Sequence, residues 1–566
     1  MGNTKIIVIG GSAAGAKAAA KARRMDEQAD VTIIQKGQYL SMASCGYPYY
    51  VGGHFDNRSM LLCTPAGVVR DPQFFQNAKK IKALNNTEAM RIDRDRKMVI
   101  CRSELDEKQT ELSYDKLVIA TGASANIPPI GNLHLSGIST LVSMDDTDYL
   151  RKVRDEKKIR KVVIIGGGLI GIETCEALQL SGYSITIVEM LPQILPFLDE
   201  QMAKLVENHM KTKGVRLLTG TGVKECIGAE GKVTGVRLSD NTVIDCELVV
   251  LAVGVKPNIK LAVEAGLKIG SLGGIAVNKY MQTSDPSIYA AGDCVEIPDL
   301  NGQGSMLAPM GDLANLEGRV AGENVIAGNV AIFPGATGTG ICKIFDFSAG
   351  TTGLSERKIC QAGNIEYETI VNASTDKPGF MGANLLISKM IIDKKSSKIL
   401  GYQSVGPGDV SKQIATAAMA VQGGFTLEQL INLDLPYAPP FSLAIDHFIA
   451  SAHIMQNKLK GRFKGISAAE VHAKLQKGET PFFLDGRSPQ EYEEMRLDIG
   501  EHLIPQGALR GKLDQLPADK NAEIICFCKI SLRGYEIALI LSANGWNNVK
   551  VMEGGIMAWP YGVKTK

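Results

Sequence analysis

Short apolar runs that end in glycine are the main hydrophobic pattern of this chain. Residues 6–9 are followed by two glycines and then by an alanine-rich segment, residues 16–24, with a helical pattern. Residues 161–165 are followed in the same way by three glycines and by a helix that runs to Leu180. Short apolar runs bounded by glycine are typical of buried parallel strands. Each segment therefore predicts a strand, a tight turn and a helix.

Both turns have the order of elements that a dinucleotide site requires, because the turn brings backbone amides and a helix start to a pyrophosphate. In the first copy Ser12 replaces the usual second glycine, and Gln35 stands where an acidic ribose ligand is usual. The second copy has all three glycines, and Glu189 ends its next strand. A carboxylate there binds an adenosine 2′-hydroxyl and repels a 2′-phosphate. NADH is therefore the predicted coenzyme, with NADPH as the less favoured alternative.

A single cysteine follows the first turn. Cys45 comes thirty residues after Gly15, in the stretch Ser41-Met-Ala-Ser-Cys45-Gly-Tyr-Pro-Tyr49. Flavoenzymes with an internal disulfide need a second cysteine on this segment, and the partner position is occupied by Ser41. The predicted catalytic pair is therefore a flavin and Cys45 alone, with the second sulfur supplied by the substrate. The alternative is that Cys45 is a small packing residue.

A second cysteine stands between a predicted strand, residues 523–527, and a predicted helix, residues 535–544. Backbone amides and the positive end of a helix can stabilise a thiolate or persulfide at such a position. Cys526, on the strand, is expected to be a packing residue. The loop residues expected to hold the sulfur are Cys528, Lys529, Ser531 and Arg533.

Composition narrows the function classes. The chain has 566 residues, of which 45% are hydrophobic, and a net charge of +2, so neither nucleic acid nor an anionic membrane is an expected partner. No apolar run approaches the length needed to span a membrane. The eleven cysteines lack CxxC or Cys/His spacing, so we expect no metal site and no disulfide scaffold. A reducing compartment, the cytoplasm, is the simplest location.

Five motifs in order, from the first turn to the Ala-Ala-Gly292-Asp293 element, resemble the flavoprotein disulfide reductases with two dinucleotide-binding domains, over about residues 4–450. The resemblance implies that FAD binds the first turn and that Asp293 holds the flavin ribityl chain. The residues expected to bind the two dinucleotides are Gly10, Gly11, Ser12, Ala13, Ala14, Gly15, Gln35, Thr121, Gly122, Gly166, Gly168, Gly171, Glu189, Gly254, Gly292 and Asp293.

The later part of the chain resembles two further domains. Residues 337–441 are similar to the dimerisation domain of the same family, which implies a homodimer, and residues 482–559 resemble a rhodanese domain. The predicted fold class is α/β, with two nested Rossmann-like domains, an α+β dimerisation domain and an α/β rhodanese domain. The predicted boundaries are 1–155 and 250–330 for FAD, 156–249 for NAD(P)H, 331–452 for dimerisation, 453–465 for a linker and 466–566 for rhodanese.

The Cys-Gly-x-Pro-Tyr element and the sequence Tyr437-Ala-Pro-Pro are similar to those of the coenzyme A disulfide reductases, and the rhodanese fusion resembles the subgroup that includes the NADH-dependent persulfide reductases. This implies a mixed disulfide of Cys45 with coenzyme A, and an acid or hydrogen-bond donor role for Tyr437. Phe380 stands where relatives have a second tyrosine. Residues 441–447 offer no His/Glu pair of the kind that glutathione reductases use.

Three residues are candidates for a coenzyme A groove. Arg23 and Arg24 are candidates because guanidinium groups suit phosphates, and Ser41 is the third. Both arginines could equally be solvated charges at a helix end.

The predicted function is an NADH- and FAD-dependent reductase in which Cys45 reduces coenzyme A persulfide, polysulfide or coenzyme A disulfide. A flavin and helix-end amides are expected to lower the pKa of its thiol. The rhodanese domain would carry or deliver persulfide sulfur. One alternative is an NADH peroxidase or oxidase that cycles through a sulfenic acid, and the other is a flavin-loaded redox sensor.

Overall fold

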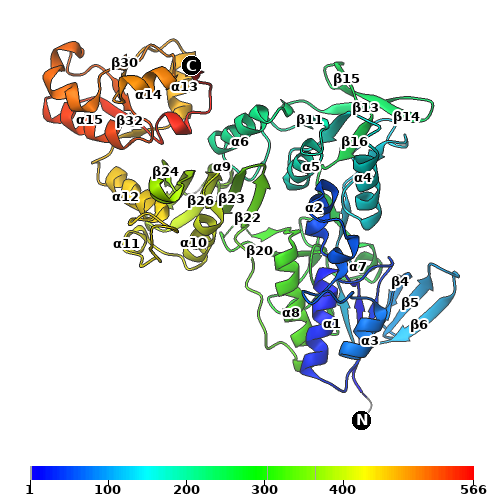
Figure 1. The fold of residues 1–566 in the computed structure, drawn as a ribbon. Helices are drawn as coiled ribbons and strands as arrows, with labels where there is room; N and C mark the ends of the chain where they lie inside the picture. Colours follow the sequence, from blue (N-terminus) through cyan, green and yellow to red (C-terminus); the bar gives the residue numbers. More distant parts are fainter. Residues whose placement is uncertain (1–2, 303, 364) are drawn as a thin grey trace. The chain divides into compact units, whose positions relative to one another are not determined.

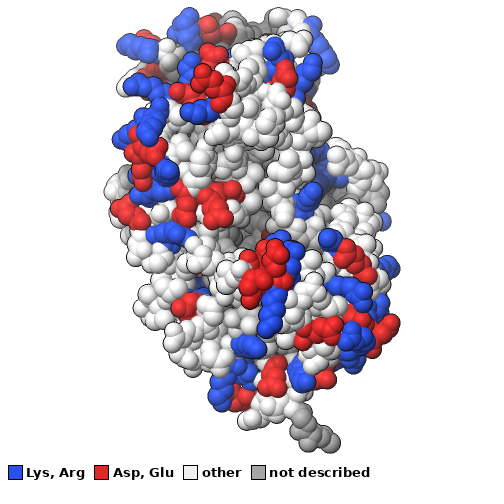
Figure 2. All heavy atoms as spheres, turned by 90° about the vertical axis from the view of Figure 1, so that its right-hand side faces the viewer, with Lys and Arg blue, Asp and Glu red and all other residues white. Residues whose placement is uncertain are grey.

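A computed structural model gives the structure of residues 3–302, 304–363 and 365–566. The chain divides into two compact units, one of residues up to 190 together with 221–336, and one of residues 191–220 together with 337–566. Lys and Arg side chains are interspersed with Asp and Glu side chains over the face in Figure 2, as a net charge of +2 leads us to expect. No helix among the described residues is long and apolar enough to cross a membrane.

The first sheet of unit 1 is wholly parallel and has the order β19-β7-β1-β2-β3. Its central strands are buried on both faces, which is why they read as continuous apolar runs and do not alternate. Its strands are β1 (Lys5–Ile9), β2 (Asp30–Ile34), β3 (Lys82–Leu84), β7 (Lys116–Ile119) and β19 (Ile288–Ala290).

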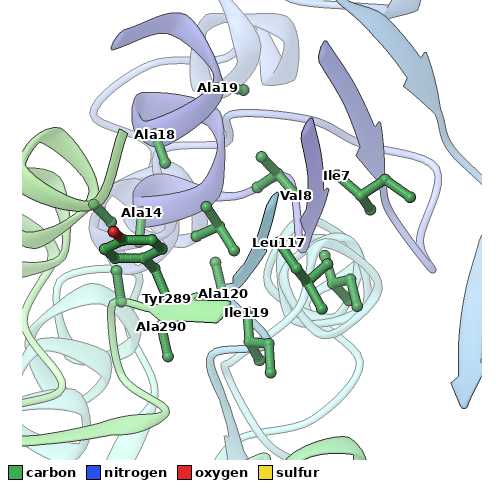
Figure 3. Close-up of a cluster of buried hydrophobic side chains, with 14 of the residues drawn as sticks. Ile7, Val8, Ala14, Ala18, Ala19, Leu117, Ile119, Ala120, Tyr289 and Ala290 are labelled. Atoms are coloured by element: carbon green, nitrogen blue, oxygen red, sulfur yellow. The ribbon is translucent and has the colours of Figure 1, made fainter. Parts of the chain in front are cut away.

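Helix α1 (Ala13–Met25) packs against this sheet through alanines. Figure 3 shows Ala14 of α1 beside the ring of Tyr289 of β19, and Ala18 and Leu117 belong to the same buried cluster. The small side chains let the helix approach the sheet closely, so this core is built from short contacts between α1 and the strands.

Helix α8 (Gly311–Ala327) lies alongside α1 (Figure 1). A Cβ atom at Gly318 would lie 2.3 Å from the carbonyl oxygen of Ala14, and one at Gly322 would lie 2.3 Å from that of Ala18. Both positions therefore require glycine, and the two helices are in backbone contact.

The second parallel sheet of unit 1 has the order β11-β10-β16-β9, with helix α5 (Leu169–Gln179) after β10. β9 belongs to this sheet, although its residues fall within the segment predicted to bind FAD. The strands are β9 (Ile138–Ser139), β10 (Lys161–Ile165), β11 (Ser184–Glu189) and β16 (Leu248–Leu251).

Smaller elements complete unit 1. The antiparallel strands are β4 (Thr87–Asp93), β5 (Met98–Ser103), β6 (Gln109–Ser113), β8 (Ala123–Ala125) with β17 (Val255–Pro257), and β13 (Val223–Ala229), β14 (Lys232–Leu238) and β15 (Val243–Asp245). A three-stranded sheet holds β18 (Ile275–Ala276), β20 (Val295–Pro298) and β21 (Ser305–Met306). The other helices are α2 (Tyr47–Gly52), α3 (Pro72–Lys79), α4 (Met144–Glu156) and α7 (Lys260–Glu264).

Unit 2 contains an antiparallel sheet of order β22-β23-β26-β25-β24, with Tyr402 and Phe448 at the centre of its core. Its strands are β22 (Gly340–Ile344), β23 (Phe347–Gly353), β24 (Tyr367–Thr375), β25 (Leu385–Asp393) and β26 (Ile399–Gly406). Its helices are α9 (Glu356–Ala362), α10 (Val410–Gln422), α11 (Leu427–Leu430) and α12 (His447–Leu459), and α12 includes the first part of the predicted linker.

Residues 191–220, which fall within the segment predicted to bind NAD(P)H, cluster with unit 2 and hold α6 (Glu200–Thr212) and β12 (Arg216–Thr219). A buried polar network fastens them there. The backbone N–H of Asp199 donates to Gln403 Oε1 at 2.8 Å, and Lys389 Nζ lies 3.0 Å from Asp199 Oδ2. Three buried polar groups thus satisfy one another.

The last domain of unit 2 has a parallel sheet of order β27-β32-β31-β28-β30. Its strands are β27 (Gly465–Ile466), β28 (Phe482–Asp485), β30 (His502–Leu503), β31 (Ile524–Phe527) and β32 (Val549–Met552), beside the antiparallel pair β29 (Met495–Arg496) and β33 (Lys564–Thr565). Its helices are α13 (Ala468–Gln476), α14 (Pro489–Glu494) and α15 (Leu532–Ala543). The predicted α/β fold class is confirmed.

Candidate active sites

The turn after β1 is packed so closely that only glycine fits at two of its positions. Gly10 has φ +101°, and a Cβ atom there would lie 2.0 Å from the carbonyl oxygen of Ala120. A Cβ atom at Gly15 would lie 1.8 Å from the carbonyl oxygen of Gly10. The Gly11 N–H donates to Gln35 Oε1 at 2.7 Å. Gln35 therefore lies at the turn, as the order of strand and turn predicts. Its neutral amide occupies the position at which a carboxylate is usual.

The turn after β10 repeats this geometry with a charged partner. A Cβ atom at Gly171 would lie 2.1 Å from the carbonyl oxygen of Gly166, whereas nothing lies within 4 Å of one at Gly168. The Gly167 N–H donates to Glu189 Oε2 at 2.7 Å. The tight packing and the open position beside Gly168 fit a pyrophosphate. That Glu189 opposes a 2′-phosphate stays a prediction.

The remaining predicted dinucleotide residues lie in the turns that follow β7, β16 and β19. Thr121 Oγ1 donates to the carbonyl oxygen of Asn258 at 2.6 Å, and the Asn258 N–H donates to that of Gly122 at 2.9 Å. Gly254 precedes β17. Asp293 is half-buried, and burial raises the pKa of its carboxyl. Its role toward a flavin stays a prediction.

Cys45 lies in the 3-10 turn Ser44–Gly46, directly before α2. The residue is exposed, and its Sγ lies 3.4 Å from the position of a Cβ atom on Gly311, the first residue of α8. The protein raises the pKa of the thiol, first through burial of the sulfur and then through the carboxyls of Glu173, Asp293 and Asp312. In the protein without a cofactor, the pKa of Cys45 is therefore raised, whereas the sequence led us to expect a pKa lowered by a flavin and helix-end amides.

Two carboxyls, the half-buried Glu173 and the buried Glu317, were not found from the sequence. Burial raises the pKa of Glu173 in α5 to about 7 and that of Glu317 in α8 to about 8. Glu317 Oε2 accepts from the Gly292 N–H at 2.6 Å. The sequence pattern does not single these two residues out, because α5 also contains Glu176 and α8 also contains Asp312 and Glu323.

The three candidates for coenzyme A lie in different environments. Arg23 is 7% exposed, and its guanidinium donates to the carbonyl oxygens of Asp26, Glu27, Lys79 and Lys80. Its candidacy is wrong, because those backbone carbonyls occupy the guanidinium. Arg24 is exposed at the end of α1.

Ser41 is held by a residue that the sequence did not point to. Ser41 has φ +48°, and its N–H donates to the carbonyl oxygen of Gly11 at 2.7 Å. Arg70 Nη1 donates to Ser41 Oγ at 2.9 Å and to its carbonyl oxygen at 2.6 Å. Ser41 thus connects the first glycine turn to a half-buried guanidinium, and no motif surrounds Arg70 that could have indicated this.

The dimerisation domain presents Tyr437 in an exposed loop and Phe380 in the exposed 3-10 turn Gly379–Met381. His447 is buried and binds two hydroxyls, with Nδ1 2.6 Å from Ser374 Oγ and Nε2 2.8 Å from Ser388 Oγ. Burial lowers its pKa to about 4. His447 is therefore a neutral structural residue, in agreement with the missing His/Glu pair.

Cys528 follows β31 and is 1% exposed. Its carbonyl oxygen accepts from the Ile556 N–H at 3.0 Å. Arg533, in the first turn of α15, makes two hydrogen bonds to the Glu491 carboxylate, at 2.6 and 2.7 Å. This pairing lowers the pKa of Glu491 to about 2, and Glu491 and then Cys528 raise the pKa of Arg533. Glu491 was not found from the sequence.

The positions of Lys529, Ser531 and Cys526 agree with the boundaries of β31 and α15. Ser531 has φ +86°, and its Oγ donates to the carbonyl oxygen of Met552 at 3.0 Å, while Lys529 is exposed. Cys526 is fully buried in β31 between Leu484 and Val551, and burial raises its pKa. Cys526 is a packing residue, as predicted.

In no part of residues 3–302, 304–363 and 365–566 do three or more His, Cys, Asp or Glu side chains gather in a way that could hold a metal ion.

Comparison with known proteins identifies the parts of the chain. Residues 4–310 match pyridine nucleotide-disulphide oxidoreductases, residues 339–448 match the dimerisation domain of that family, and residues 467–560 match rhodanese-like domains. A solved structure of a NAD-dependent persulfide reductase from A. fulgidus is 41% identical, with a TM-score of 0.93, over 98% of this chain and 100% of that chain.

Two further relatives agree. The structure of reduced Bacillus anthracis CoADR-RHD is 33% identical, with a TM-score of 0.90, over 99% of this chain and 98% of that chain. An NAD(P)H coenzyme A polysulfide/persulfide reductase from Pyrococcus horikoshii is 34% identical over 454 residues, which are 80% of this chain and 98% of that protein. The chain belongs to the pyridine nucleotide-disulphide oxidoreductase family and carries a C-terminal rhodanese-like domain.

Proposed function

We propose that this protein uses NADH to reduce coenzyme A persulfide, polysulfide or coenzyme A disulfide at Cys45, and that Cys528 carries persulfide sulfur. One observation carries the proposal. Cys45 faces the start of α8 near Asp293, with serine at the position of a second cysteine, in a chain that also holds the Cys528 loop. A thiol without a resolving partner needs a substrate that brings its own sulfur.

The sulfur chemistry balances with coenzyme A persulfide. The Cys45 thiolate attacks the coenzyme A sulfur, the sulfur–sulfur bond of the persulfide breaks, and hydrosulfide leaves. The product is a mixed disulfide of Cys45 and coenzyme A. Two electrons and one proton, the equivalent of the hydride of NADH, then return the Cys45 thiolate and coenzyme A thiol with release of NAD⁺. With coenzyme A disulfide the first leaving group is the coenzyme A thiolate.

FAD, which this family uses together with NAD(P)H, would pass the two electrons from the coenzyme to the mixed disulfide. The Gly10–Gly15 turn with Gln35 would hold its pyrophosphate and ribose, and Asp293 its ribityl chain. The Gly166–Gly171 turn and Glu189 would hold NADH. The start of α8 would favour a negative sulfur on Cys45, because unpaired amides point along the axis of that helix.

A proton must reach the departing thiolate. Tyr437 is exposed in its loop and can donate one, and relatives of the coenzyme A type imply this role. Phe380 has no proton to give, so we assign no part of the proton transfer to that position. In unit 1, Glu173 has a pKa of about 7 and is a second group able to hold a proton near Cys45.

Arg24 and Ser41 remain the proposed contacts of coenzyme A. The Arg70 guanidinium is half-buried and donates through Nη1 to Ser41 and through Nη2 to the carbonyl oxygen of Cys63. Because both of these nitrogens already bind protein oxygens, we assign Arg70 the role of holding Ser41 in place and not that of a phosphate contact.

A homodimer is part of the proposal, supported by the apolar side chains that unit 2 leaves exposed. Large hydrophobic residues are rarely gathered on a free surface. The exposed fractions are 74% for Met419, 71% for Phe441, 57% for Ile445 and 80% for Phe380. The cytoplasm is the proposed location, since all eleven cysteines are free thiols.

Anaerobic stopped-flow spectroscopy of the flavin tests the function. The NADH-reduced holoenzyme is mixed with coenzyme A disulfide, coenzyme A persulfide, polysulfide or hydrogen peroxide, and the rate of flavin reoxidation is measured. We expect a coenzyme A substrate or polysulfide to reoxidise the flavin at the turnover rate. Fastest reoxidation by peroxide, with a sulfenic acid on Cys45, would indicate the peroxidase instead. No turnover with any of the four would indicate a sensor.

A further inference from the structure

One short segment of the rhodanese domain, residues 553–560, has contacts on two sides. It begins after β32 with Glu553, contains the 3-10 turn η6 (Ile556–Ala558) and ends at Pro560. One side touches the loop that carries Cys528, and the other touches the dimerisation domain and α6. We call residues 553–560 the bridging segment.

On its first side the bridging segment supports the Cys528 loop through the backbone. The Ile556 N–H donates to the carbonyl oxygen of Cys528 at 3.0 Å, and the Met557 N–H donates to that of Lys529 at 3.2 Å. A Cβ atom at Gly555 would lie 2.4 Å from the Cys528 carbonyl oxygen. The loop therefore rests directly on the segment, and a shift of the segment must move the loop.

On its second side the bridging segment is fixed by a buried carboxylate. Glu553 is 2% exposed, and its Oε2 accepts from the N–H of Val371 in edge strand β24 at 2.9 Å. Its Oε1 accepts from Lys458 Nζ at 2.7 Å. Lys458 Nζ, from α12, also donates to the carbonyl oxygen of Thr369 at 2.8 Å and lies 3.0 Å from Glu368 Oε1.

The far end of the bridging segment is fixed as well. Gln201 Nε2 donates to the carbonyl oxygen of Ala558 at 2.9 Å, and Asn208 Nδ2 donates to that of Pro560 at 2.8 Å. Both donors lie in α6. The segment is thus fixed at both ends by residues outside the rhodanese domain, and the Cys528 loop rests on the stretch between them.

We propose that Glu553 is a positioning residue for sulfur transfer at Cys528, because it fixes to β24 and Lys458 the segment on which the Cys528 loop rests. This inference rests on the proposed role of Cys528 as a persulfide carrier. It adds that the dimerisation domain determines how well the loop amides are aimed at the sulfur. A misplacement of about 1 Å at such a site can lower a rate by about a hundredfold.

The test measures single-turnover persulfide formation on Cys528 in the full-length protein, by rapid quenching with a sulfane donor and mass spectrometry of the Cys528 peptide. Glu553→Ala should lower the rate constant by about tenfold or more, while reduction of coenzyme A disulfide at Cys45 is unchanged. Glu553→Gln, which keeps an oxygen for the Val371 N–H, should recover part of that loss. A partly unfolded sample lowers the amplitude of the reaction but not its rate constant.

The matched control is Glu523→Ala, which removes a carboxylate that pairs with Lys550 at 2.7 Å and Lys474 at 3.1 Å near the other end of the same sheet. It should leave the rate constant unchanged. If Glu553→Ala does not fold, Lys458→Met removes the partner from outside the rhodanese domain and should cause the same loss.

A rate constant for Glu553→Ala or Lys458→Met equal to that of the wild type would overturn the inference. Absence of persulfide on Cys528 in the wild type would overturn the proposed function instead. In that case the alkylation rate of Cys528 decides whether Glu553 positions the loop, because a misplaced loop changes that rate and a correctly placed one does not.

Discussion

The two cysteine sites differ in the charged groups that lie near the sulfur. Burial of the sulfur, followed by the carboxyls of Glu173, Asp293 and Asp312, raises the pKa of the Cys45 thiol. Cys528 is buried in a loop beside the Arg533 guanidinium. The rhodanese loop therefore has a guanidinium nearby, paired with Glu491, whereas the charged groups near Cys45 are acidic. A redox thiol that ionises only beside its cofactor is protected from unwanted oxidation when the cofactor is absent.

We expect the largest effect from a substitution of Cys45, which should affect one cysteine site and spare the other. Cys45→Ser should lower turnover with every sulfur substrate by at least about a thousandfold, since a serine hydroxyl forms no mixed disulfide. Reduction of the flavin by NADH and persulfide formation on Cys528 should persist. Steady-state NADH oxidation, stopped-flow spectra and peptide mass spectrometry measure the three properties. Near-normal reduction of coenzyme A disulfide by this variant would contradict the mechanism.

The reciprocal change tests the other site. Cys528→Ser should abolish persulfide formation from a sulfane donor and leave reduction of coenzyme A disulfide at Cys45 unchanged. The reason is that the loop amides and Arg533 stabilise a sulfur anion but not a hydroxyl of far higher pKa. Mass spectrometry by peptide gives the position of the added sulfur. Persulfide on the buried Cys526 in the wild type, and none on Cys528, would refute the loop assignment.

Removal of FAD should change Cys45 alone. Burial and three carboxyls raise the pKa of Cys45 above the ordinary 9.0 in the protein without cofactor. A raised thiol pKa means that the thiolate forms only at higher pH, so iodoacetamide should alkylate Cys45 of the apoprotein with a midpoint above pH 9.0 and that of the holoenzyme at lower pH. The exposed Cys360 is the control within the same digest. Identical profiles with and without FAD would show that the flavin does not activate this thiol.

We expect the smallest effect from a change in the preference for NADH over NADPH. In the proposed function, only the reaction at Cys45 uses this coenzyme. Glu189→Ala should reduce the preference for NADH over NADPH by about tenfold, because one negative charge near the 2′-phosphate is removed. Values of kcat/KM for both coenzymes measure it. Gln35→Ala is the matched variant in the other turn and should leave the preference unchanged. Equal kcat/KM values for NADH and NADPH in the wild type would remove the basis of the assignment.

The sequence was sufficient for the features that depend on local backbone requirements. Gly10 and Gly166 could be placed in turns from the sequence, since only glycine fits such turns. In the structure, their close contacts leave no room for a side chain. Gln35 and Glu189 could be placed beside those turns because parallel strands end at one edge of a sheet. The Cys528 loop followed from the strand and helix on either side.

Residues whose roles depend on contacts between distant segments could not be predicted in this way. Arg23 ends a helix, and its sequence position does not show that carbonyls of Lys79 and Lys80 surround it. Glu491 and Glu553 are likewise acids without a motif, and their partners lie 42 and 182 residues away in the chain. Charge at a helix or strand end is common on surfaces, so only the structure distinguishes such residues.

The glycines of α8 fix the sulfur site from a distance. Gly318 and Gly322 hold α8 on α1 by backbone contact, and the first residue of α8 faces Cys45. A helix rises about 1.5 Å per residue, so the nearer of the two contacts is about 10 Å along the axis from the first residue of α8. Any side chain at either glycine must push the two helices apart and tilt the start of α8 away from the thiol. Substitutions at Gly318 and Gly322, which take no part in the sulfur chemistry, are therefore expected to disturb the Cys45 site as well.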